Sequence, residues 1–465
     1  MSNLPGSGLL VMKFGGTSVG SAERMRAACD LIAQAAAQRP VVAVVSAMSK
    51  ITDLLLDTTR HAEAGDRNGI EANLNTLETR HIEAAAGLGV NVLPQIAELA
   101  GEFRRIVEGI QMLGHRPPRT VDAAVAIGER LSALLISVHL QSRGLPAEAV
   151  NAAELIVTDA VFNSASPLMN ATTEKVTKRL APMVQPPLSK IAIVTGFNGA
   201  TADGRPTTLG RGGSDFSASI LAAALDASEL WIWSDVDGIL TADPRLVKDA
   251  RILTEVTYSE AAELAYAGAK VLHPRTLAPL VEKAIPVVCK NSFAPEKPGT
   301  RIVPVLGEGN AGARAVTSMG NVALVSVEPV KGVRVMARVL DALDGANVEV
   351  LALSSSSYRQ SFCFLVRIEE LDAVTQAIES ALVLELAHGY VLPIEVDRNV
   401  GLLAVVGEGM RGFSGIAGRI FTAISRENVN IIAIAQGSSE LTISIVVRRD
   451  GLEKAVRAVH AECHL

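Results

Sequence analysis

The stretch "KFGGTSV" at residues 13–19 follows the apolar run Leu9 to Met12, and it is the feature that best indicates the fold. An apolar strand that ends at Lys13 and turns through Gly15 and Gly16 leaves bare backbone beside a cation. A strand, a glycine turn and a helix start can gather amide N–H groups around an anion. The order excludes a P-loop, in which the lysine follows the second glycine. The stretch therefore indicates a phosphate-binding turn, with a tight turn beside a solvated lysine as the alternative.

The composition limits the class of protein. At 465 residues the chain is expected to form roughly two to four domains. Apolar residues make up 49% of the chain and aromatic residues only 3%, which indicates cores of Ala, Val, Leu and Ile and suits α/β layers. The formal net charge of −6 provides no basic field for nucleic acid or an anionic membrane. We expect neither as a partner, and a small ligand instead.

The cysteines and the hydropathy pattern bear on location. Cys29, Cys289, Cys363 and Cys463 are far apart and show neither C-x-x-C nor metal-ligand spacing, which favours a reducing compartment. The N-terminus has no basic region before its short apolar stretch, and no apolar run reaches the roughly 18 residues of a membrane span. We expect a soluble, cytoplasmic protein.

Short β-branched runs alternate with alanine-rich amphipathic stretches in the first part of the chain. Strands are predicted at 40–46, 190–197, 230–236 and 285–291. This alternation indicates an α/β domain with a mostly parallel sheet covered on both faces, and ligands of such sheets bind at the carboxyl ends of the strands. Residues 60–118 are helical, charged and without a strand pattern, so we expect a helical excursion near the site or an inert elaboration.

A repeat follows the glycine-rich stretch 305–321. Residues 337–357 align with 418–438 at a constant offset of 81, so that Arg338 matches Arg419 and Asn347 matches Asn428. Each copy continues into an apolar strand, which predicts two small strand–helix–strand–strand units. The predicted domains are 1–305 for the sheet domain and 320–395 and 400–465 for the two repeat units, which can interleave.

Two stretches of the chain partly match the sequence patterns of a dinucleotide-binding site and of an EF-hand calcium site. Gly407, Gly409 and Gly412 have the G-x-G-x-x-G spacing of a dinucleotide site, but no acidic residue ends the next strand, so a helix-entry turn is favoured. The acidic stretch 233–245 is not an EF-hand, because with Gly238 at the sixth loop position the first would be Trp233.

Four further segments at strand ends or helix starts carry groups that suit a multiply charged anion. They are "SAMSKITD" at 46–53, "GRGGSDFSAS" at 210–219, "WSDVDGILTADPR" at 233–245 and "AGAKVLHPRT" at 267–276. Arg211 precedes a bare glycine turn, and its guanidinium fits a carboxylate or phosphate in a bidentate manner. For Ser214 and Asp215 the alternative is an N-cap and a helix-dipole partner.

These motifs together resemble the aspartokinase family. The resemblance rests on "KFGGTSV", "GRGGSD", "DVDGILTADPR" at 235–245, "GAKVLHP" at 268–274 and a tandem pair ending in "VNIIAIAQGSSE" at 429–440. It implies a three-layer, carbamate-kinase-like amino-acid-kinase domain followed by two α+β, ferredoxin-like ACT domains. It also implies phosphorylation of the aspartate β-carboxylate by ATP with Mg²⁺, as the first step towards lysine, threonine and methionine.

The resemblance assigns roles to residues of this chain. The residues with implied catalytic roles are Lys13, Arg211 and Asp215. Those implied to line the aspartate pocket are Ser46, Thr52, Glu129, Arg211 and Asp215. Those implied to contact the nucleotide are Lys13, Gly15, Gly16, Ser214, Ser234, Asp235, Leu240, Arg245, Lys270 and Val271. No residue is assigned as a metal ligand. Ser234 stands where threonine is usual and keeps the hydroxyl. Leu240 stands where tyrosine is common and lacks the aromatic ring that could contact a nucleotide.

The chemistry agrees with such a set of residues. A carboxylate nucleophile is already ionised at pH 7 and needs no general base. Lys13, backbone N–H groups and Mg²⁺ would neutralise the γ-phosphoryl charge, while Arg211 and Glu129 would supply the charges that hold aspartate. For Glu129 the alternative is a solvated helix face.

The repeat pair is expected to regulate activity and to join chains. Gln436 ends a predicted strand, and its counterpart in the first copy is Ser355; both are candidate effector contacts for threonine or lysine. A homodimer or homotetramer through the ACT domains is expected. Two rival functions stay open: a non-catalytic amino-acid sensor, and another kinase of the same fold.

Overall fold

The computed structural model describes residues 8–185, 189–269, 272–307, 312–330, 333–357 and 360–465. It divides into two compact units. The first comprises Met1–Ile239, Thr254–Tyr258 and Leu272–Pro304, and the second comprises Leu240–Leu253, Ser259–Val271 and Val305–Leu465. None of the helices among the described residues is long and apolar enough to cross a membrane.

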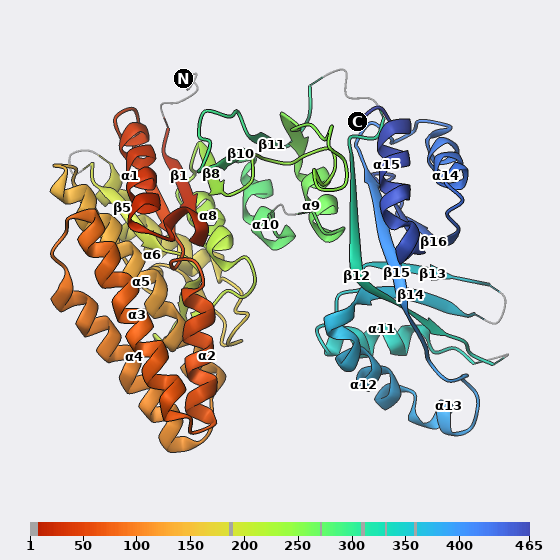
Figure 1. Cartoon of the computed structure of the whole chain (residues 1–465), viewed down its shortest axis with the longest axis horizontal. Coiled ribbons are helices and arrows are strands. Elements are labelled where there is room, and N and C mark those ends of the chain that lie inside the picture. Colours follow the sequence, from red (N-terminus) through yellow and green to blue (C-terminus); the bar gives the residue numbers. More distant parts are fainter. Residues whose placement is uncertain (1–7, 186–188, 270–271, 308–311, 331–332, 358–359) are drawn as a thin grey trace. The chain divides into compact units, whose positions relative to one another are not determined.

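The first unit is built on an eight-stranded sheet with the order β3-β5-β2-β1-β8-β10-β11-β9 (Figure 1). All neighbouring pairs in this sheet are parallel except β10 with β11. Its strands are β1 (Leu10–Phe14), β2 (Val41–Val45), β3 (Ala147–Val150), β5 (Ile191–Thr195), β8 (Glu229–Ser234), β9 (Glu255–Thr257), β10 (Val287–Asn291) and β11 (Thr300–Val303). A small second sheet holds β4 (Val157–Thr158), β6 (Asn198–Thr201) and β7 (Pro206–Thr208). The predicted mostly parallel sheet is confirmed.

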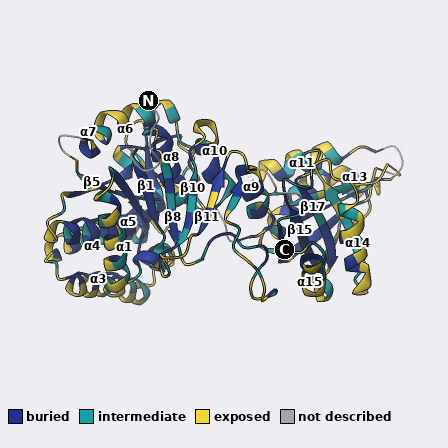
Figure 2. Ribbon diagram, turned by 90° about the horizontal axis from the view of Figure 1, so that it is seen from above, coloured by how far each residue is buried: buried dark blue, intermediate teal, exposed yellow. Residues whose placement is uncertain are grey.

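Burial explains why the central strands read as continuous apolar runs. Every residue of β1, β2 and β5 is buried, as expected for parallel strands covered on both faces (Figure 2). In β1, Leu10, Met12 and Phe14 pack into a core with the helices that follow β1 and β2. Because side chains alternate along a strand, Lys13 points to the opposite face, where α8 contacts β1.

The helices of this unit cover both faces of the sheet. They are α1 (Ala22–Ala36), α2 (Ile51–Glu63), α3 (Arg67–Leu88), α4 (Leu93–Leu113), α5 (Pro118–Ser142), α6 (Met169–Arg179), α7 (Ala181–Val184), α8 (Gly213–Ala224) and α10 (Pro274–Lys283). The helical excursion predicted over 60–118 is the part of the chain that forms α3, α4 and the end of α2. Its end lies near the site, because Arg116 and Pro118 line the cavity described below.

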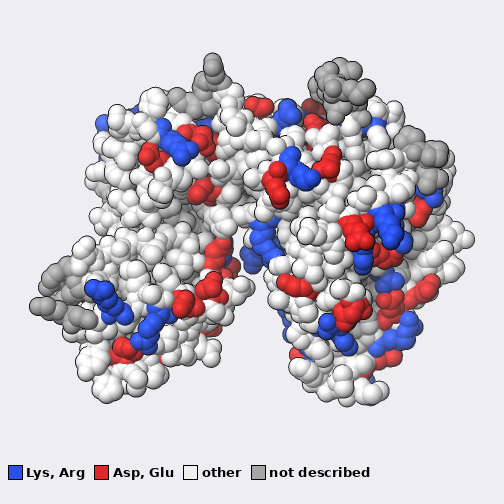
Figure 3. All heavy atoms as spheres, turned by 180° about the vertical axis from the view of Figure 1, so that it is seen from behind, with Lys and Arg blue, Asp and Glu red and all other residues white. Residues whose placement is uncertain are grey.

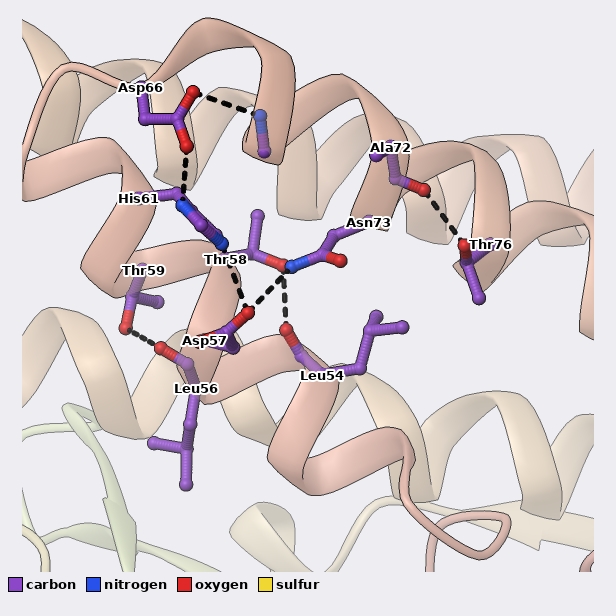
Figure 4. Close-up of polar contacts among 11 residues, drawn as sticks. Leu54, Leu56, Asp57, Thr58, Thr59, His61, Asp66, Ala72, Asn73 and Thr76 are labelled. Atoms are coloured by element: carbon purple, nitrogen blue, oxygen red, sulfur yellow. Dashed lines mark hydrogen bonds and ion pairs between the residues drawn. The ribbon is translucent and has the colours of Figure 1, made fainter.

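The corner between α2 and α3 is held by a histidine between two carboxylates (Figure 4). His61 Nε2 lies 3.1 Å from Asp57 Oδ2, and His61 Nδ1 lies 2.8 Å from Asp66 Oδ2. The other carboxylate oxygen of Asp66 accepts the Gly69 N–H and so caps α3. Asn73 of α3 donates to Asp57 at 3.2 Å, so both helices are tied to the same carboxylate.

The second unit contains a six-stranded antiparallel sheet with the order β13-β14-β12-β15-β17-β16. Its strands are β12 (Ala315–Val327), β13 (Ala352–Ser355), β14 (Phe362–Arg367), β15 (Glu395–Val406), β16 (Ile431–Gln436) and β17 (Thr442–Arg448); its helices are α11 (Met336–Gly345), α12 (Leu371–Ala381), α13 (Val383–Ala387), α14 (Ile416–Arg426) and α15 (Leu452–Glu462). Helix α9 (Tyr258–Tyr266) falls almost wholly in this unit.

The two repeat copies share the long central strands β12 and β15, which pair from Ala315 with Val406 to Ser326 with Glu395. One core cluster joins β12 and β14 to α11 and α12, and a second joins β15 and β17 to α14 and α15. The domain boundaries 1–305, 320–395 and 400–465 stay a prediction, since the compact units follow a different division of the chain.

Local features of the repeat have physical causes. The matched Asn347 and Asn428 both have positive φ, 56° and 54°, a conformation that asparagine tolerates better than most residues. The G-x-G-x-x-G stretch forms the turn after β15, where a Cβ at Gly407 would lie 2.6 Å from the Gly312 carbonyl oxygen. A dinucleotide fold needs parallel strands, and every described pair in this sheet is antiparallel. The helix-entry interpretation is therefore the correct one.

Residues 240–253 come between strands of the first unit in sequence but pack in the core of the second. Ala242 and Val247 join the cluster of α14 and α15, and Thr241 Oγ1 lies 3.0 Å from His460 Nε2 of α15. Arg251 donates to the His464 carbonyl at 3.0 Å, and Arg457 to the Leu246 carbonyl at 2.9 Å. This segment is thus an integral part of the second unit.

The surface charge is mixed in sign. On the face shown in Figure 3, Lys and Arg side chains are interspersed with Asp and Glu side chains. Exposed ion pairs occur within the first unit, such as Arg104 with Glu71 and Arg143 with Asp30, each at 2.7 Å. This arrangement agrees with the small net charge of −6 and leaves the binding of an anion to local groups.

Candidate active site

A cavity of about 780 Å³ lies at the carboxyl ends of β1, β2 and β5 in the first unit. Such strand ends are where open α/β sheets bind ligands. It is lined by residues from six stretches of the chain: Lys13 and Gly16; Ser46–Lys50, Thr52, Asp53 and Leu56; Arg116, Pro118, Val121, Asp122, Val125 and Glu129; Asn163; Phe197; and Thr208 with Gly210–Asp215. Every residue predicted to line the aspartate pocket is among them.

Lys13 is held by an acidic partner at the start of α8. Its Nζ lies 2.6 Å from Asp215 Oδ1, and the two side chains are only 10% and 20% exposed. A lysine in the body of a strand is directed to one face, and Asp215 in the first turn of a helix is directed back towards the helix start. The pair therefore fixes the ammonium group at the cavity wall, where it faces whatever anion enters.

The glycines around this pair keep space for the backbone to approach. A Cβ at Gly16 would lie only 2.9 Å from the Ala47 carbonyl oxygen, whereas one at Gly15 would be in ordinary contact, 3.5 Å from Lys13 Nζ. Gly212 is the N-cap of α8 at φ 69°, a left-handed conformation that glycine adopts without strain. No side chain caps this helix, so Ser214 is not the N-cap.

Glu129 is a buried carboxylate aimed at the loop after β2. It is 2% exposed, so the alternative of a solvated helix face is wrong. Its Oε1 accepts the Ala47 N–H at 3.1 Å, while Oε2 has no hydrogen-bond partner among the described protein atoms. Burial raises the pKa of Glu129 from 4.5 to about 7. A buried carboxylate oxygen without a donor is suited to a ligand ammonium group.

Arg211 lies in the glycine turn between β7 and α8, on the cavity wall and exposed to solvent. Ser46 directly follows β2, and Thr52 is in the first turn of α2; both are half-buried. The cavity thus has an arginine, a lysine, a buried carboxylate and two hydroxyls on its wall. These groups match the ammonium and carboxylate groups of an acidic amino acid and the charge of a phosphoryl group.

Asp122 and Asn163 are among the residues of this wall that sequence reasoning missed. Asp122 is 1% exposed and accepts hydrogen bonds from Asn163 and Thr208. Asn163 has φ 69°, an uncommon conformation for a residue other than glycine. A signal for Asp122 was present, because it precedes Glu129 by seven residues, about two helical turns, and so lies on the same face of α5.

The residues assigned to the nucleotide fall in different parts of the structure. Ser234 ends β8, and Asp235 follows it as an exposed residue in the first unit. Leu240 and Arg245 belong to the second unit, where Arg245 pairs with Asp243 at 2.5 Å. Lys270 and Val271 lie outside the described residues. The nucleotide assignments therefore stay predictions.

Asp237, which lies in this stretch, already has two partners. Asp237 Oδ2 lies 2.6 Å from Lys297 Nζ, and its other oxygen accepts from Asn291 at 2.7 Å. These partners lower the pKa of Asp237. Over the described ranges, no group of three or more His, Cys, Asp or Glu side chains is placed to hold a metal ion.

The candidate effector residues occupy equivalent places. Ser355 is the last residue of β13, Gln436 is the last residue of β16, and both are exposed. These strands are the two edges of the six-stranded sheet. Edge strands have free backbone groups that can pair with a ligand or another chain.

Comparisons with known proteins agree with this architecture. A model of the amino acid kinase family matches residues 8–291, and an ACT domain model matches residues 403–463. The chain is 35% identical over 472 residues to the bifunctional aspartokinase/homoserine dehydrogenase 1 of Arabidopsis thaliana, an alignment that covers 99% of this chain and 51% of that protein. It is 34% identical over 469 residues to aspartokinase 1 of the same plant, covering 97% of this chain and 79% of that one. The chain spans about half the length of the bifunctional curated relatives that it matches.

Solved structures of aspartokinase III from E. coli are similar over nearly the whole chain. The complex with aspartate and ADP, in the R-state, has a TM-score of 0.85 at 29% identity; the complex with lysine and aspartate, in the T-state, has a TM-score of 0.79 at 30% identity. Both alignments cover 98% of this chain and 100% of the other. Fold and site define an amino acid kinase with an attached ACT region. The chain belongs to the aspartokinase family.

Proposed function

We propose that this chain transfers the γ-phosphoryl group of MgATP to the β-carboxylate of L-aspartate and forms 4-phospho-L-aspartate, the first step of lysine, threonine and methionine biosynthesis. The observation that carries the proposal is the cavity in which the Lys13–Asp215 pair, the buried Glu129 and the Arg211 turn occur together. The aspartate and ADP bound to E. coli aspartokinase III support the same substrates here.

The chemistry requires alignment and charge neutralisation more than proton transfer. One oxygen of the β-carboxylate attacks the γ-phosphorus, and the bond from that phosphorus to the oxygen shared with the β-phosphate breaks. No proton moves, because the nucleophile is already ionised. Lys13 stabilises the charge that builds on the transferring group, and Asp215 holds the Lys13 ammonium in place.

Aspartate binding uses the two other charges of the wall. Glu129 Oε2, which lacks a donor among the described protein atoms, would accept from the α-ammonium group. Arg211 would bind the α-carboxylate, and the hydroxyls of Ser46 and Thr52 would orient the acceptor. Replacement of either charged residue is expected to cost on the order of 2 to 5 kcal/mol of aspartate binding.

The magnesium ion enters with the nucleotide as part of the substrate. The absence of an acidic cluster among the described residues, together with the pairing of Asp215 with Lys13, supports a metal bound mainly by the phosphates. It would neutralise phosphate charge during the transfer.

We also propose feedback inhibition by threonine or lysine through the second unit. The lysine bound to the T-state of E. coli aspartokinase III supports an amino-acid effector. The segment 240–253, which carries the predicted nucleotide contacts Leu240 and Arg245, packs in the same core as α15. An effector that changes this core would therefore also displace Leu240 and Arg245, which belong to the same unit.

Assembly and location complete the proposal. The edge strands β13 and β16, whose residues are partly exposed, support a homodimer or homotetramer through the ACT region, testable by light scattering. The four cysteines are free thiols, which supports a reducing, cytoplasmic environment, testable by cell fractionation.

An acceptor panel separates this function from its rivals. ADP release from MgATP would be measured with aspartate, glutamate, acetylglutamate, carbamate and UMP. We expect turnover with aspartate to exceed that with the other acceptors. Preference for another acceptor would indicate a different kinase of the same fold, and aspartate binding without turnover would indicate a sensor.

A further inference from the structure

Asp122 has a buried carboxylate on the wall of the cavity, and it takes no part in the proposed reaction. It is 1% exposed, and it accepts three hydrogen bonds. The backbone nitrogens of Asn163 and Thr208 lie 2.9 Å and 3.1 Å from Asp122 Oδ2. The hydroxyl oxygen of Thr208 lies 2.7 Å from Asp122 Oδ1. Burial raises the pKa of Asp122, so the carboxyl group is kept there against a desolvation cost.

The two hydrogen-bond partners of Asp122, Asn163 and Thr208, both line the cavity close to Arg211. Thr208 is the last residue of β7, and only Leu209 and Gly210 separate it from Arg211. Asn163 lines the cavity in a left-handed conformation. A Cβ at Gly210 would lie 3.2 Å from the Asn163 carbonyl oxygen, so the two segments are packed against each other. Asp122 therefore anchors the base of the Arg211 turn.

The same helix provides the other end of the amino-acid site. Asp122 and Glu129 both belong to α5 and both line the cavity. Glu129 would contact the ammonium group itself, whereas Asp122 reaches the carboxylate-binding arginine through Thr208. The anchor therefore holds the carboxylate-binding arginine at a fixed place relative to the ammonium-binding Glu129.

We propose that Asp122 is a positioning residue that fixes the Arg211 turn relative to Glu129, so that the α-carboxylate and the α-ammonium group of aspartate are bound together. This inference rests on the proposed function. A role as a direct partner of the ammonium group is disfavoured by its three internal hydrogen bonds, whereas Glu129 Oε2 has no donor among the described protein atoms. A negative charge on this wall also does not assist the binding of two anionic substrates.

Two substitutions separate positioning from charge. Asp122→Asn can keep all three contacts, because its oxygen can accept both N–H groups while its amide donates to the Thr208 hydroxyl. Asp122→Ala removes all of them and leaves buried donors unpaired. We expect Asp122→Ala to raise the KM for aspartate about tenfold or more, with the KM for ATP within about threefold, and Asp122→Asn to stay within about threefold of the parent.

Coupling between Asp122 and Arg211 gives a readout that a general loss of stability would not move. We expect the effect of Asp122→Ala on the KM for aspartate to shrink below about threefold in an Arg211→Ala background, because residues that act as a unit are not additive. The matched control is Thr172→Val. Thr172 is also fully buried and accepts the Val157 N–H at 3.0 Å, but it does not line the cavity, so the KM for aspartate should be unchanged.

Hydrogen exchange tests the anchor without any activity. Amides of Asn163 and Thr208 should exchange faster in Asp122→Ala than in the parent or Asp122→Asn. Unchanged exchange, an Asp122→Asn variant as impaired as Asp122→Ala, or full additivity with Arg211→Ala would each overturn the inference. A parent protein without aspartate kinase activity would contradict the proposed function instead, and the exchange result would still decide whether Asp122 anchors the turn.

Discussion

The Lys13 ammonium lies 2.6 Å from Asp215 Oδ1, and this pair joins the end of β1 to the first turn of α8 across the cavity wall. The lysine is thus fixed by a residue from a different layer of the fold. A long side chain held in one position loses less freedom when it meets a phosphoryl group. The pair explains why a cation can stand at the end of a buried strand.

Loss of the Lys13 ammonium should act mainly on the chemical step. We expect Lys13→Ala to lower kcat by about 100-fold or more, the range for removal of one key electrostatic donor, with a smaller change in the KM for ATP. Steady-state kinetics at saturating aspartate would measure it. A kcat within about threefold of the parent, about 0.65 kcal/mol, would show that Lys13 is only a lysine at a turn.

Aspartate binding should depend on the protonation of Glu129. Burial places the pKa of Glu129 at about 7, so the carboxylate that would bind the ammonium group is lost as the pH falls below that value. We expect kcat/KM for aspartate to fall about tenfold per pH unit below the pKa, with the KM for ATP less affected. Glu129→Gln should lower kcat/KM and abolish this dependence. A pH profile that is the same in both proteins would contradict the assignment.

The same carboxyl group should influence stability with a defined sign. Its pKa is raised from an ordinary value of 4.5 to about 7 in the folded protein, so the folded state binds the proton more tightly than the unfolded state. Stability from this group is therefore present at low pH and is lost as the pH rises towards about 7, by on the order of 3 kcal/mol. The thermal midpoint of Glu129→Gln minus that of the parent should therefore increase as the pH is raised from about 5 to about 8. An equal pH dependence would argue that Glu129 is not buried as described.

Lys50 is a residue of the cavity wall in strained backbone. It has φ 65° and ψ 3° as the N-cap of α2, and its side chain makes no cap hydrogen bond. Since the left-handed region disfavours side chains with a Cβ, Lys50→Gly should be more stable to unfolding than Lys50→Ala by about 1 kcal/mol. Both variants lack the charge, so their difference isolates the backbone effect in thermal melts. Equal stability of the two variants would mean that this conformation carries no strain.

Several elements were predictable from sequence because their causes are local. The β-branched runs formed the buried strands, and the glycine turns at 15–16 and 212–213 lie where the backbone approaches other groups. The repeat offset also predicted that Ser355 and Gln436 would hold equivalent places, and both end an edge strand.

Other features depended on contacts between distant residues and could not be predicted. The pairing of Lys13 with Asp215 follows from the packing of α8 on the sheet, which no local pattern encodes. The sequence pattern of α5 is compatible with Glu129 on a solvent-exposed helix face. In the structure α5 is buried on several sides, and Glu129 is buried with it. The inclusion of residues 240–253 in the core of the second unit likewise depends on the tertiary fold.

Feedback control should depend on Gln436 and not on the aspartate cavity. We expect threonine or lysine at millimolar concentration to inhibit, and Gln436→Ala to weaken the inhibition about 5- to 150-fold, the range of typical couplings, with uninhibited kcat unchanged. Ser355→Ala is the matched variant in the other copy. Its effect should be different in size, because the two residues differ in hydrogen-bonding capacity. Activity that is insensitive to lysine, threonine and methionine, singly and in pairs, would leave the ACT region with an assembly role alone.

Trapping of the acyl phosphate detects the product of the proposed reaction itself. Folded protein would be incubated with aspartate, MgATP and hydroxylamine in the absence of effector, and the aspartyl hydroxamate would be quantified against a control without enzyme. We expect hydroxamate formation that requires both aspartate and ATP and falls by about 100-fold in Lys13→Ala. Hydroxamate no higher than in the control, from protein that is folded and binds both substrates, would rule out the proposed transfer.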